Sequence, residues 1–388
     1  MKKKLMTLQQ HRLLKEAGRL IAFSERLKHA QKETTGRNRE EREEKCRRSA
    51  KAASAVAALS GDIEEFLASR YDFRYNLLTD ETEFRAAGQR SAAFTPVGKR
   101  ELNTFCIEAH AEGIPCWDKD LNRYVYSTYI PAYHPFLLYM DELPDWDGKD
   151  RLTALACRVS SRPHWVRGFH TWMLGLASQW MGVSGLHANS VAPVLVSREQ
   201  GRRKSSFCRA LMPDVLARYY TDNLKLTSQG QAERMLAEMG MLNMDEFDKY
   251  AESKMPLLKN LMQMSVLNIR KAYQQNFRQL PRIASFIGTS NREDLLVDRT
   301  GSRRFLCVSL EHAIDCVTPV EHEQLYAQLK AELLSGERSW FNKEEEQAIQ
   351  QHNALFYKHI PEEEVFRLCF RLATEAVSYT HLRAHETP

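Results

Sequence analysis

The stretch Val194-Leu-Val-Ser-Arg-Glu-Gln-Gly-Arg-Arg-Lys-Ser-Ser-Phe207 decides how this chain is interpreted. The apolar run Val194–Val196 ends in a polar loop, and apolar residues at helical spacing resume after Lys204-Ser205-Ser206. A strand, a loop, a Lys-Ser pair and a helix form the layout of a phosphate-binding loop. In such a loop, backbone N–H groups surround a polyphosphate, the lysine neutralises the outer phosphates, and the serine hydroxyl holds a magnesium ion.

The loop departs from the usual pattern G-x-x-x-x-G-K-[ST] at both glycines. Arg198 and Arg203 occupy the two glycine positions, and Gly201 lies between them. A side chain limits how closely the backbone can approach a phosphate, and it disfavours positive φ. Taken alone, the loop is therefore compatible with a phosphate site or with a basic turn between a strand and a helix.

Composition indicates a soluble protein of two or three domains. The chain has 388 residues, of which 43% are hydrophobic and 27% charged, enough for a substantial core. The net charge of +5 is compatible with nucleic acid as a partner. No apolar run approaches the roughly 20 residues that span a bilayer, and no signal peptide follows Met1-Lys-Lys-Lys4, so a cytoplasmic location without a membrane partner is expected.

The eight cysteines indicate free thiols in a reducing compartment. Several lie in apolar runs, such as Cys307 within Phe305–Val308, and are expected to be buried. The chain contains no C-x-x-C pair, which argues against a structural zinc site.

The sequence of the first 150 residues mainly predicts individual helices and strands. Residues 1–60 are expected to form a solvated, charged helix or tail, which is favoured over a DNA-binding arm. Hydrophobic period and turn signals predict a helix Ile63–Ser69 capped by Asp62, a hairpin of Tyr71–Leu77 with Thr82–Arg85, a helix Glu101–Ala111, and a strand Arg123–Tyr129. The aromatic segment Pro131–Trp146 could stack single-stranded bases, but a packed interdomain core is favoured.

Two amphipathic helices precede the loop, at Arg151–Val159 and Trp165–Trp180. The apolar residues of the second helix recur at helical spacing and predict core packing. His170, on the same helix, is expected to be a satisfied buried or boundary histidine rather than a metal ligand.

Three polar groups downstream of the loop suit nucleotide chemistry. Asp245-Glu246 ends the apolar run that begins at Met241, as in a Walker B element, although taken alone the motif Asp-Glu-Phe-Asp favours an acidic helix start. Asn291 ends a second strand-like run from Pro281, where it could orient water or contact a γ-phosphate. Arg303-Arg304 follow a turn and suit an arginine finger offered to a neighbouring subunit, although surface ion pairing is the more common role of such a pair.

The order of these elements is more informative than any one of them. In a parallel sheet, the strand ends before the loop, before Asp245-Glu246 and at Asn291 would meet at one edge, where ligands bind in such sheets. This conjunction favours a nucleotide site.

Residues about 65–310 resemble the virulence-associated protein E family, in particular the branch from Bacteroides-type mobile elements and prophages. The motifs that carry the resemblance are Tyr133-His-Pro135, Trp146-Asp-Gly148, Gln200-Gly201 with Lys204-Ser205, Asn243-Met-Asp-Glu-Phe247, Leu258-Lys-Asn260, Ile269-Arg-Lys271, Leu280-Pro-Arg282, Gly288-Thr-Ser-Asn291, and Asp298 with Gly301-Ser-Arg-Arg-Phe305. The family is similar to superfamily 3 helicases, so the resemblance implies a three-layer α/β P-loop core of the AAA+ type behind a mixed α+β N-terminal domain.

The resemblance implies a role for each matching residue. Lys204 and Ser205 would bind phosphate and magnesium. Asp245 and Glu246 would form the Walker B pair, with Asp245 also on the metal. Asn291 would be the sensor asparagine, and Arg303 or Arg304 the finger. The loop residues Gln200, Gly201, Arg203 and Ser206 would complete the nucleotide site, and Arg270 and Lys271 would contact DNA.

The expected function is that of an ATPase, with ATP and Mg²⁺ bound, acting as a DNA helicase or primase-associated replication protein of a mobile element. The expected partners are DNA, mainly single-stranded, further copies of the chain in a ring, and a primase. Two alternatives remain: a nucleotide-binding scaffold with little hydrolysis, and a non-enzymatic DNA-binding partner of a primase.

The expected domains are a charged segment 1–60, an α+β domain 61–150, an ATPase domain 151–312 and the start of a helical C-terminal domain 313–376. Residues 377–388 resemble a translated sequencing adapter and are expected to be an assembly artefact that forms no part of the fold. The natural protein is accordingly expected to continue beyond Ala376.

Overall fold

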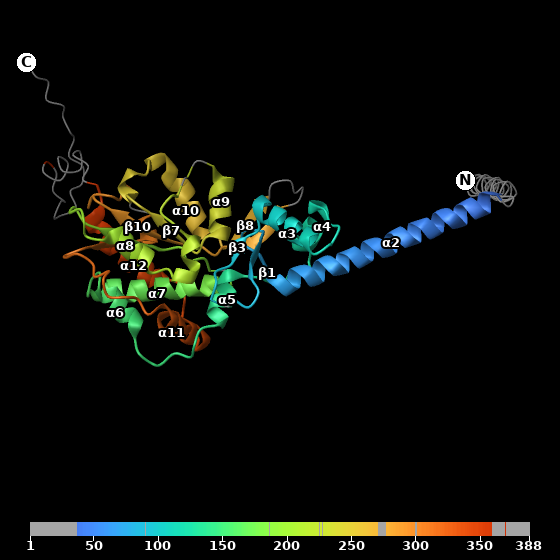
Figure 1. Cartoon of the computed structure of the whole chain (residues 1–388). Helices are drawn as coiled ribbons and strands as arrows, with labels where there is room; N and C mark the ends of the chain where they lie inside the picture. Colours follow the sequence, from blue (N-terminus) through green and yellow to red (C-terminus); the bar gives the residue numbers. More distant parts are fainter. Residues whose placement is uncertain are drawn as a thin grey trace, which may run out of the picture. The chain divides into compact units, whose positions relative to one another are not determined.

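The computed structural model describes residues 37–89, 91–185, 187–224, 226, 228–270, 277–298, 301–358 and 369. The chain forms two compact units (Figure 1). The smaller unit comprises the chain up to residue 75 together with residues 81–132, and the larger comprises residues 76–80 and the chain from residue 133. The expected boundaries at residues 150 and 312 therefore both lie inside the larger unit.

The smaller unit packs helices against a short four-stranded sheet. Its elements are α2 (Arg37–Arg70), β1 (Tyr71–Asn76), β2 (Glu81–Ala86), β3 (Thr95–Pro96), α3 (Lys99–Ala111), α4 (Asp118–Val125) and β4 (Ala132–Tyr133), with sheet order β3-β2-β1-β4. The core gathers Ile63, Phe66 and Leu67 of α2 with Phe105 of α3. The predicted hairpin and the helix at 101–111 are confirmed.

Two local predictions for this unit are wrong. Asp62 does not cap a helix, because α2 runs unbroken through it; the alanine-rich stretch before it favours helix. The segment from Arg123 begins inside helix α4 and forms no strand. Leu121 and Val125, four residues apart, are both fully buried, and this helical spacing prevails over the alternation of tyrosines.

The larger unit is built on a five-stranded parallel sheet. Its strands are β5 (Ala192–Val196), β6 (Tyr220–Thr221), β7 (Met241–Met244), β10 (Ser285–Ser290) and β11 (Phe305–Ser309), in the order β11-β5-β10-β7-β6. β5, β7 and β10 are buried along their whole length, as expected for parallel strands covered on both faces. The strands predicted before the loop, before Asp245 and before Asn291 are confirmed.

Helices cover both faces of this sheet (Figure 1). Leu195 of β5 packs with α7 and α8, whereas Val194 and Val196 pack with α9 and α10, so alternate side chains enter opposite cores. The helices are α5 (Pro135–Asp141), α6 (Arg151–Cys157), α7 (Pro163–Trp180), α8 (Lys204–Ala210), α9 (Gln229–Glu238), α10 (Met255–Gln263), α11 (His322–Leu334) and α12 (Lys343–His352), with short 3₁₀ turns η1 (Asp214–Tyr219), η2 (Phe247–Lys249), η3 (Glu252–Lys254), η4 (Ser302–Arg304) and η5 (Asn353–Phe356). The helices predicted around 151–159 and 165–180 are confirmed, and Phe136 of the aromatic segment is fully buried in this core.

The helices after residue 312 belong to the same core as the sheet. The ring of Tyr326 on α11 stacks on Trp180 with centroids 4.9 Å apart, and its hydroxyl donates to the carbonyl of Leu211 at 2.9 Å. The expected adapter-derived segment 377–388 lies outside the described residues. Within the described part of the chain, no helix combines the length and apolarity needed to cross a bilayer.

Candidate functional site

The carboxyl ends of three neighbouring strands bring the predicted polar residues together. β10 lies between β5 and β7, and Gly288 of β10 is in register with Val194 on one side and Met244 on the other. All three strands are parallel, so the loop after β5, Asp245 after β7 and Asn291 after β10 reach the same edge. The predicted meeting of strand ends is therefore confirmed.

Lys204 begins α8 and points its amine back into the loop. Nζ donates to the carbonyl of Ser197 at 3.1 Å and to Oδ1 of Asn291 at 3.0 Å. Only 8% of the residue is exposed. Burial lowers the pKa of Lys204, while the nearby carboxylates of Asp245 and Asp248 act in the opposite direction. The amine is thus a cation held by two oxygen acceptors, with acidic groups close by.

The two arginines in the glycine positions take different roles. Arg203 adopts the left-handed conformation, with φ 62°, that a glycine adopts more easily, and Gly201 has φ 77°. Arg198 pairs with Glu293 at 2.8 Å. The loop therefore accepts backbone strain at Arg203 and still delivers Lys204 to the sheet edge.

The acidic pair is fixed by hydroxyl groups from two directions. Ser205 Oγ donates to Asp245 Oδ1 at 2.8 Å, and Thr289 Oγ1 donates to the same oxygen at 2.7 Å. Thr289 Oγ1 also accepts the backbone N–H of Glu246 at 3.1 Å. Glu246 has φ 51°, and its carboxylate pairs with Lys249 at 2.6 Å. Of the three described non-glycine residues with positive φ, two, Arg203 and Glu246, lie at this site.

Asp248 is a member of the site that the sequence did not single out. Its Oδ1 accepts from Ser290 Oγ at 2.9 Å and from the backbone N–H of Asn291 at 3.2 Å. Asp248 thereby holds the end of β10 and sets where Asn291 points. The available signal was the third acid in Asp-Glu-Phe-Asp, which also suggested a helix start; Thr289 had no comparable signal.

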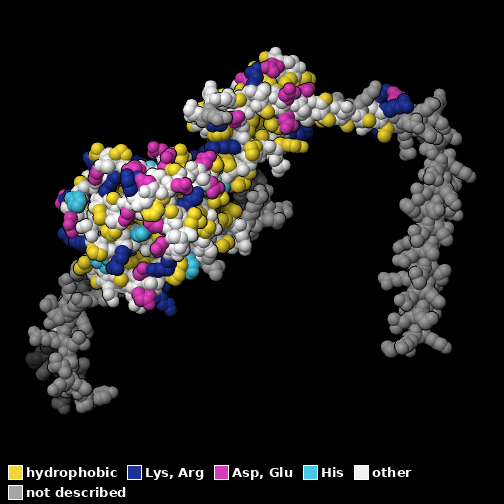
Figure 2. Space-filling model, turned by 90° about the horizontal axis from the view of Figure 1, so that it is seen from below, with side chains coloured by type: hydrophobic (Ala, Val, Ile, Leu, Met, Phe, Trp, Pro, Cys, Tyr) yellow, Lys and Arg dark blue, Asp and Glu magenta, His cyan; other side chains and the backbone are white. Residues whose placement is uncertain are grey.

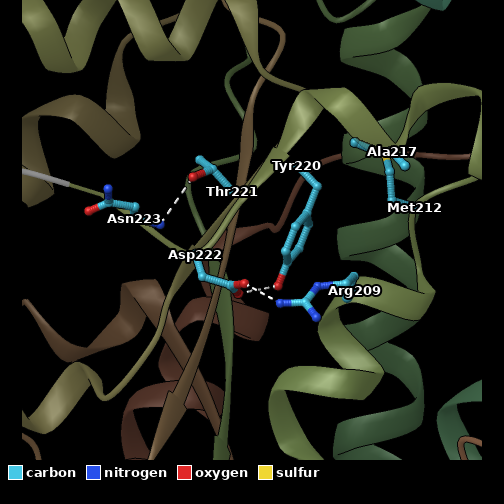
Figure 3. A pocket seen from close by; sticks show the side chains of 7 residues that line it. All are labelled: Arg209, Met212, Ala217, Tyr220, Thr221, Asp222 and Asn223. Atoms are coloured by element: carbon cyan, nitrogen blue, oxygen red, sulfur yellow. Dashed lines mark hydrogen bonds and ion pairs between the residues drawn. The ribbon is translucent and has the colours of Figure 1, made fainter.

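Asp222, after β6, joins α8, the helix that begins with Lys204, to β7, the strand before the acidic pair. Figure 3 shows its contacts with Arg209 and Tyr220. Asp222 accepts from Arg209 of α8 at 2.6 Å, from the hydroxyl of Tyr220 at 2.6 Å, and from Asn243 of β7 at 2.7 Å. Burial acts to raise the pKa of Asp222, but these hydrogen bonds outweigh it and hold the pKa below its usual range. An open hollow of about 430 Å³ lies beside this network.

Arg303 and Arg304 lie at the opposite edge of the sheet. They precede β11, whose first residue pairs with Ala192 at the amino end of β5. Five strand residues, roughly 13 Å, separate that edge from the loop. Arg303 pairs with Glu346 of α12 at 3.3 Å, and Arg304 Nε is buried without a hydrogen-bond partner among the described residues.

The remaining predicted residues are placed as follows. Gln200 and Ser206 are exposed at the loop and on the first turn of α8. Arg270 ends β8 (Val266–Arg270), which pairs antiparallel with β9 (Phe277–Pro281) to form a hairpin. Lys271 lies outside the described residues.

The fold and the site place this chain among α/β proteins with a parallel sheet. At one edge of that sheet lie a buried lysine, a hydroxyl group and an acidic pair. The virulence-associated protein E-like domain matches residues 140–358, more than half of the chain. The chain therefore belongs to the family of virulence-associated protein E-like domains. The family expected from the sequence motifs is thus confirmed, and the match extends past residue 312.

Comparison with curated proteins gives no match. Among solved structures, the chain is similar to an apo structure of the NrS-1 C-terminal region, at 13% identity and a TM-score of 0.45, with 75% of this chain and 74% of the other covered. A second form of the same region gives 14% identity, the same coverage and a TM-score of 0.43. Likeness at this level supports no conclusion about function.

Proposed function

We propose that this chain is a P-loop ATPase of the AAA+ and superfamily 3 helicase type, acting in DNA replication of a mobile element. The observation that carries the proposal is the direct linkage of Lys204 to Asn291 and of Ser205 to Asp245, at 3.0 and 2.8 Å. These residues come from three different strand ends and offer a cation, a hydroxyl, an amide and a carboxylate to one ligand. A five-stranded parallel sheet with helices on both faces supports the three-layer P-loop assignment.

The residues present fit a Mg²⁺–ATP complex. Ser205 supplies a hydroxyl and Asp245 a carboxylate, the hard oxygen donors that Mg²⁺ prefers, and they already lie within hydrogen-bond distance. When bound, the ion would neutralise phosphate charge. Lys204 would exchange its contact with the Ser197 carbonyl for a phosphate oxygen, a stronger acceptor because it is charged.

Glu246 and Asn291 are suited to act on the attacking water. The Glu246 carboxylate would accept a proton as water attacks the γ-phosphoryl group, giving ADP and phosphate. Its partner Lys249 is exposed, so this ion pair is weak and easily exchanged. Asn291, held by Asp248 through its backbone, would orient the water or contact the γ-phosphate.

The position of Arg303 and Arg304 supports assembly into a ring. Because they lie at the far sheet edge, they do not reach the lysine of their own chain. A finger role requires that the arginine edge of one copy face the loop edge of the next. The hairpin of β8 and β9, with Arg270 at its end, is the proposed contact with single-stranded DNA, and a primase remains a proposed partner.

Two features favour the scaffold alternative, in which nucleotide binds with little turnover. The Lys204 amine is satisfied by two protein oxygens, and Arg203 holds a left-handed conformation beside it. The third candidate, a DNA-binding partner without enzymatic activity, receives less support. Figure 2 shows basic and acidic side chains interspersed over the visible face of the larger unit, with no extended field of one sign among the described residues on that face.

The test measures nucleotide binding and ATP hydrolysis together, with and without single-stranded DNA. Lys204→Ala is expected to lower DNA-stimulated hydrolysis by about 100-fold or more, as does the loss of one donor that stabilises transition-state charge in other enzymes. Lys119→Ala, which removes an exposed lysine of α4, is the matched control. Hydrolysis that survives in Lys204→Ala would refute the site, and binding without turnover in the wild type would establish the scaffold.

A further inference from the structure

Three potential metal ligands gather in the smaller unit, outside the residues that the family match covers. Cys106, His110 and Cys116 each offer a donor atom, and these atoms lie within 4.8 Å of one another. The sequence argued against zinc because it contains no C-x-x-C pair, but the spacing here is C-x₃-H-x₅-C. The cluster therefore depends on how the chain folds after α3.

The first two ligands share one face of α3. Cys106 and His110 are four residues apart, one helical turn, and Cys106 Sγ lies 3.9 Å from His110 Nε2. In a tetrahedral zinc site a thiolate and an imidazole nitrogen lie roughly 3.6 Å apart, since the metal–ligand distances are about 2.3 and 2.0 Å. The pair is thus close to the separation that zinc requires.

A glycine-terminated helix end returns Cys116 to this face. Gly113 has φ 80°, its N–H donates to the carbonyl of His110 at 3.0 Å, and the N–H of Ile114 donates to the carbonyl of Ala109 at 3.0 Å. This pair of bonds is the Schellman arrangement, which reverses the chain at a helix end. Cys116 follows two residues later and is 1% exposed.

We propose that Cys106, His110 and Cys116 bind one zinc ion, which ties the C-terminal half of α3 to the segment leading into α4. Two sulfur donors and one nitrogen donor suit zinc better than Mg²⁺ or Ca²⁺, which prefer oxygen. The two thiols lose their protons to solvent on binding, so the thiolates balance the charge of the ion. His110 Nε2 exchanges its 2.6 Å contact with the Cys116 carbonyl for the metal.

The three ligands differ in exposure, so that the ion can enter from solvent and keep a fourth coordination position open. Cys116 is buried, Cys106 is half-buried and His110 is exposed, so the site opens to solvent on the histidine side. The nearby acids already have partners: Glu108 accepts from the Tyr71 hydroxyl at 2.6 Å, and Glu112 pairs with Arg70. Asp120 accepts from the backbone N–H of Trp117 at 3.1 Å and pairs with Arg123, so we assign water to the fourth position. α3 and α4 pack against each other, and the ion adds a link between the turn and the helix (Figure 1).

The test measures zinc content and zinc-dependent thermal stability of the full chain, prepared with reductant and supplied with zinc. One zinc per chain is expected, with a rise in melting temperature on zinc addition. His110→Gln and Cys106→Ser are expected to weaken zinc binding by about tenfold or more and to abolish that rise. Both residues are at least partly exposed, so both variants should fold, whereas Cys116→Ser removes a buried thiol. Cys157→Ser, at an exposed cysteine of α6, is the matched control and should bind zinc normally.

Cobalt loading supplies an independent readout. Thiolate ligation gives a sulfur-to-metal charge-transfer band in the near ultraviolet, which should vanish in Cys106→Ser and persist in Cys157→Ser. The proposal is overturned by wild-type protein that takes up no zinc, by full zinc binding in both His110→Gln and Cys106→Ser, or by a Cys106–Cys116 disulfide in the reduced, zinc-supplied protein.

Discussion

Replacing Thr289 with valine tests whether one hydroxyl fixes the acidic pair. Thr289 is 2% exposed, and its Oγ1 donates to Asp245 while accepting the N–H of Glu246. Valine keeps the shape of the side chain and removes both hydrogen bonds. Losing a bond to a half-buried carboxylate costs about 1–2 kcal/mol, and leaving the Glu246 N–H without its acceptor costs about 1 kcal/mol. Thr289→Val should therefore lower the free energy of unfolding by about 2–3 kcal/mol.

Urea unfolding followed by tryptophan fluorescence measures this loss. Trp165, Trp172 and Trp180 are fully buried in the same unit and report on its unfolding. Thr289→Ser is the matched control, because it keeps the hydroxyl and loses one methyl group, at about 1 kcal/mol. ATP hydrolysis should fall strongly in the valine variant and weakly in the serine variant. A valine variant as stable as wild type, within about 0.5 kcal/mol, would refute the role assigned to Thr289.

Three further perturbations test other parts of the larger unit. Asp248→Ala should lower kcat for ATP about 10–100-fold through displacement of Asn291 while leaving nucleotide affinity nearly unchanged, whereas Asp248→Asn, which keeps the acceptor oxygen, should stay near wild type. His170 donates to Glu332 at 2.6 Å, and this bond raises the pKa of His170. The contribution of this pair to the free energy of unfolding is complete at pH values below about 6.5, the pKa of histidine in the unfolded chain, and it is lost as the pH rises through the raised pKa of the folded state. His170→Gln should therefore destabilise the protein more at about pH 6 than at about pH 9 in urea titrations. Arg282 is 1% exposed and donates to four backbone carbonyls at 2.6–3.4 Å. Arg282→Met should therefore lower the free energy of unfolding by about 3 kcal/mol or more in thermal unfolding, and a loss below about 1 kcal/mol would contradict this.

The prediction that the hydrogen-bonding groups of His170 are satisfied is confirmed by its contact with Glu332, and the predicted core packing of α7 is confirmed by its buried tryptophans. Both follow from helical period, which is a local property of sequence. The prediction of a strand at Arg123–Tyr129 was wrong because a segment this short can satisfy both the strand period and the helical period. The joint burial of Leu121 and Val125 favours the helix.

The sequence determined the elements and residues that local chemistry specifies. Apolar runs ending in polar residues defined β5, β7 and β10, and Lys204-Ser205, Asp245-Glu246 and Asn291 followed from their positions at those strand ends. Because all the strands are parallel, placing strand ends was enough to predict that these groups share an edge.

Contacts between distant segments were decided by the tertiary structure. Thr289, Asp248 and Asp222 act through hydrogen bonds to residues 13–44 positions away, and no local pattern marks such a partner. The far-edge position of Arg303 depends on the direction and register of β11, and the Cys106–His110–Cys116 cluster depends on the chain reversal at Gly113. Hydrophobic periodicity and composition reflect the conformation of a few neighbouring residues. Strand order and turn geometry decide which side chains meet across the fold.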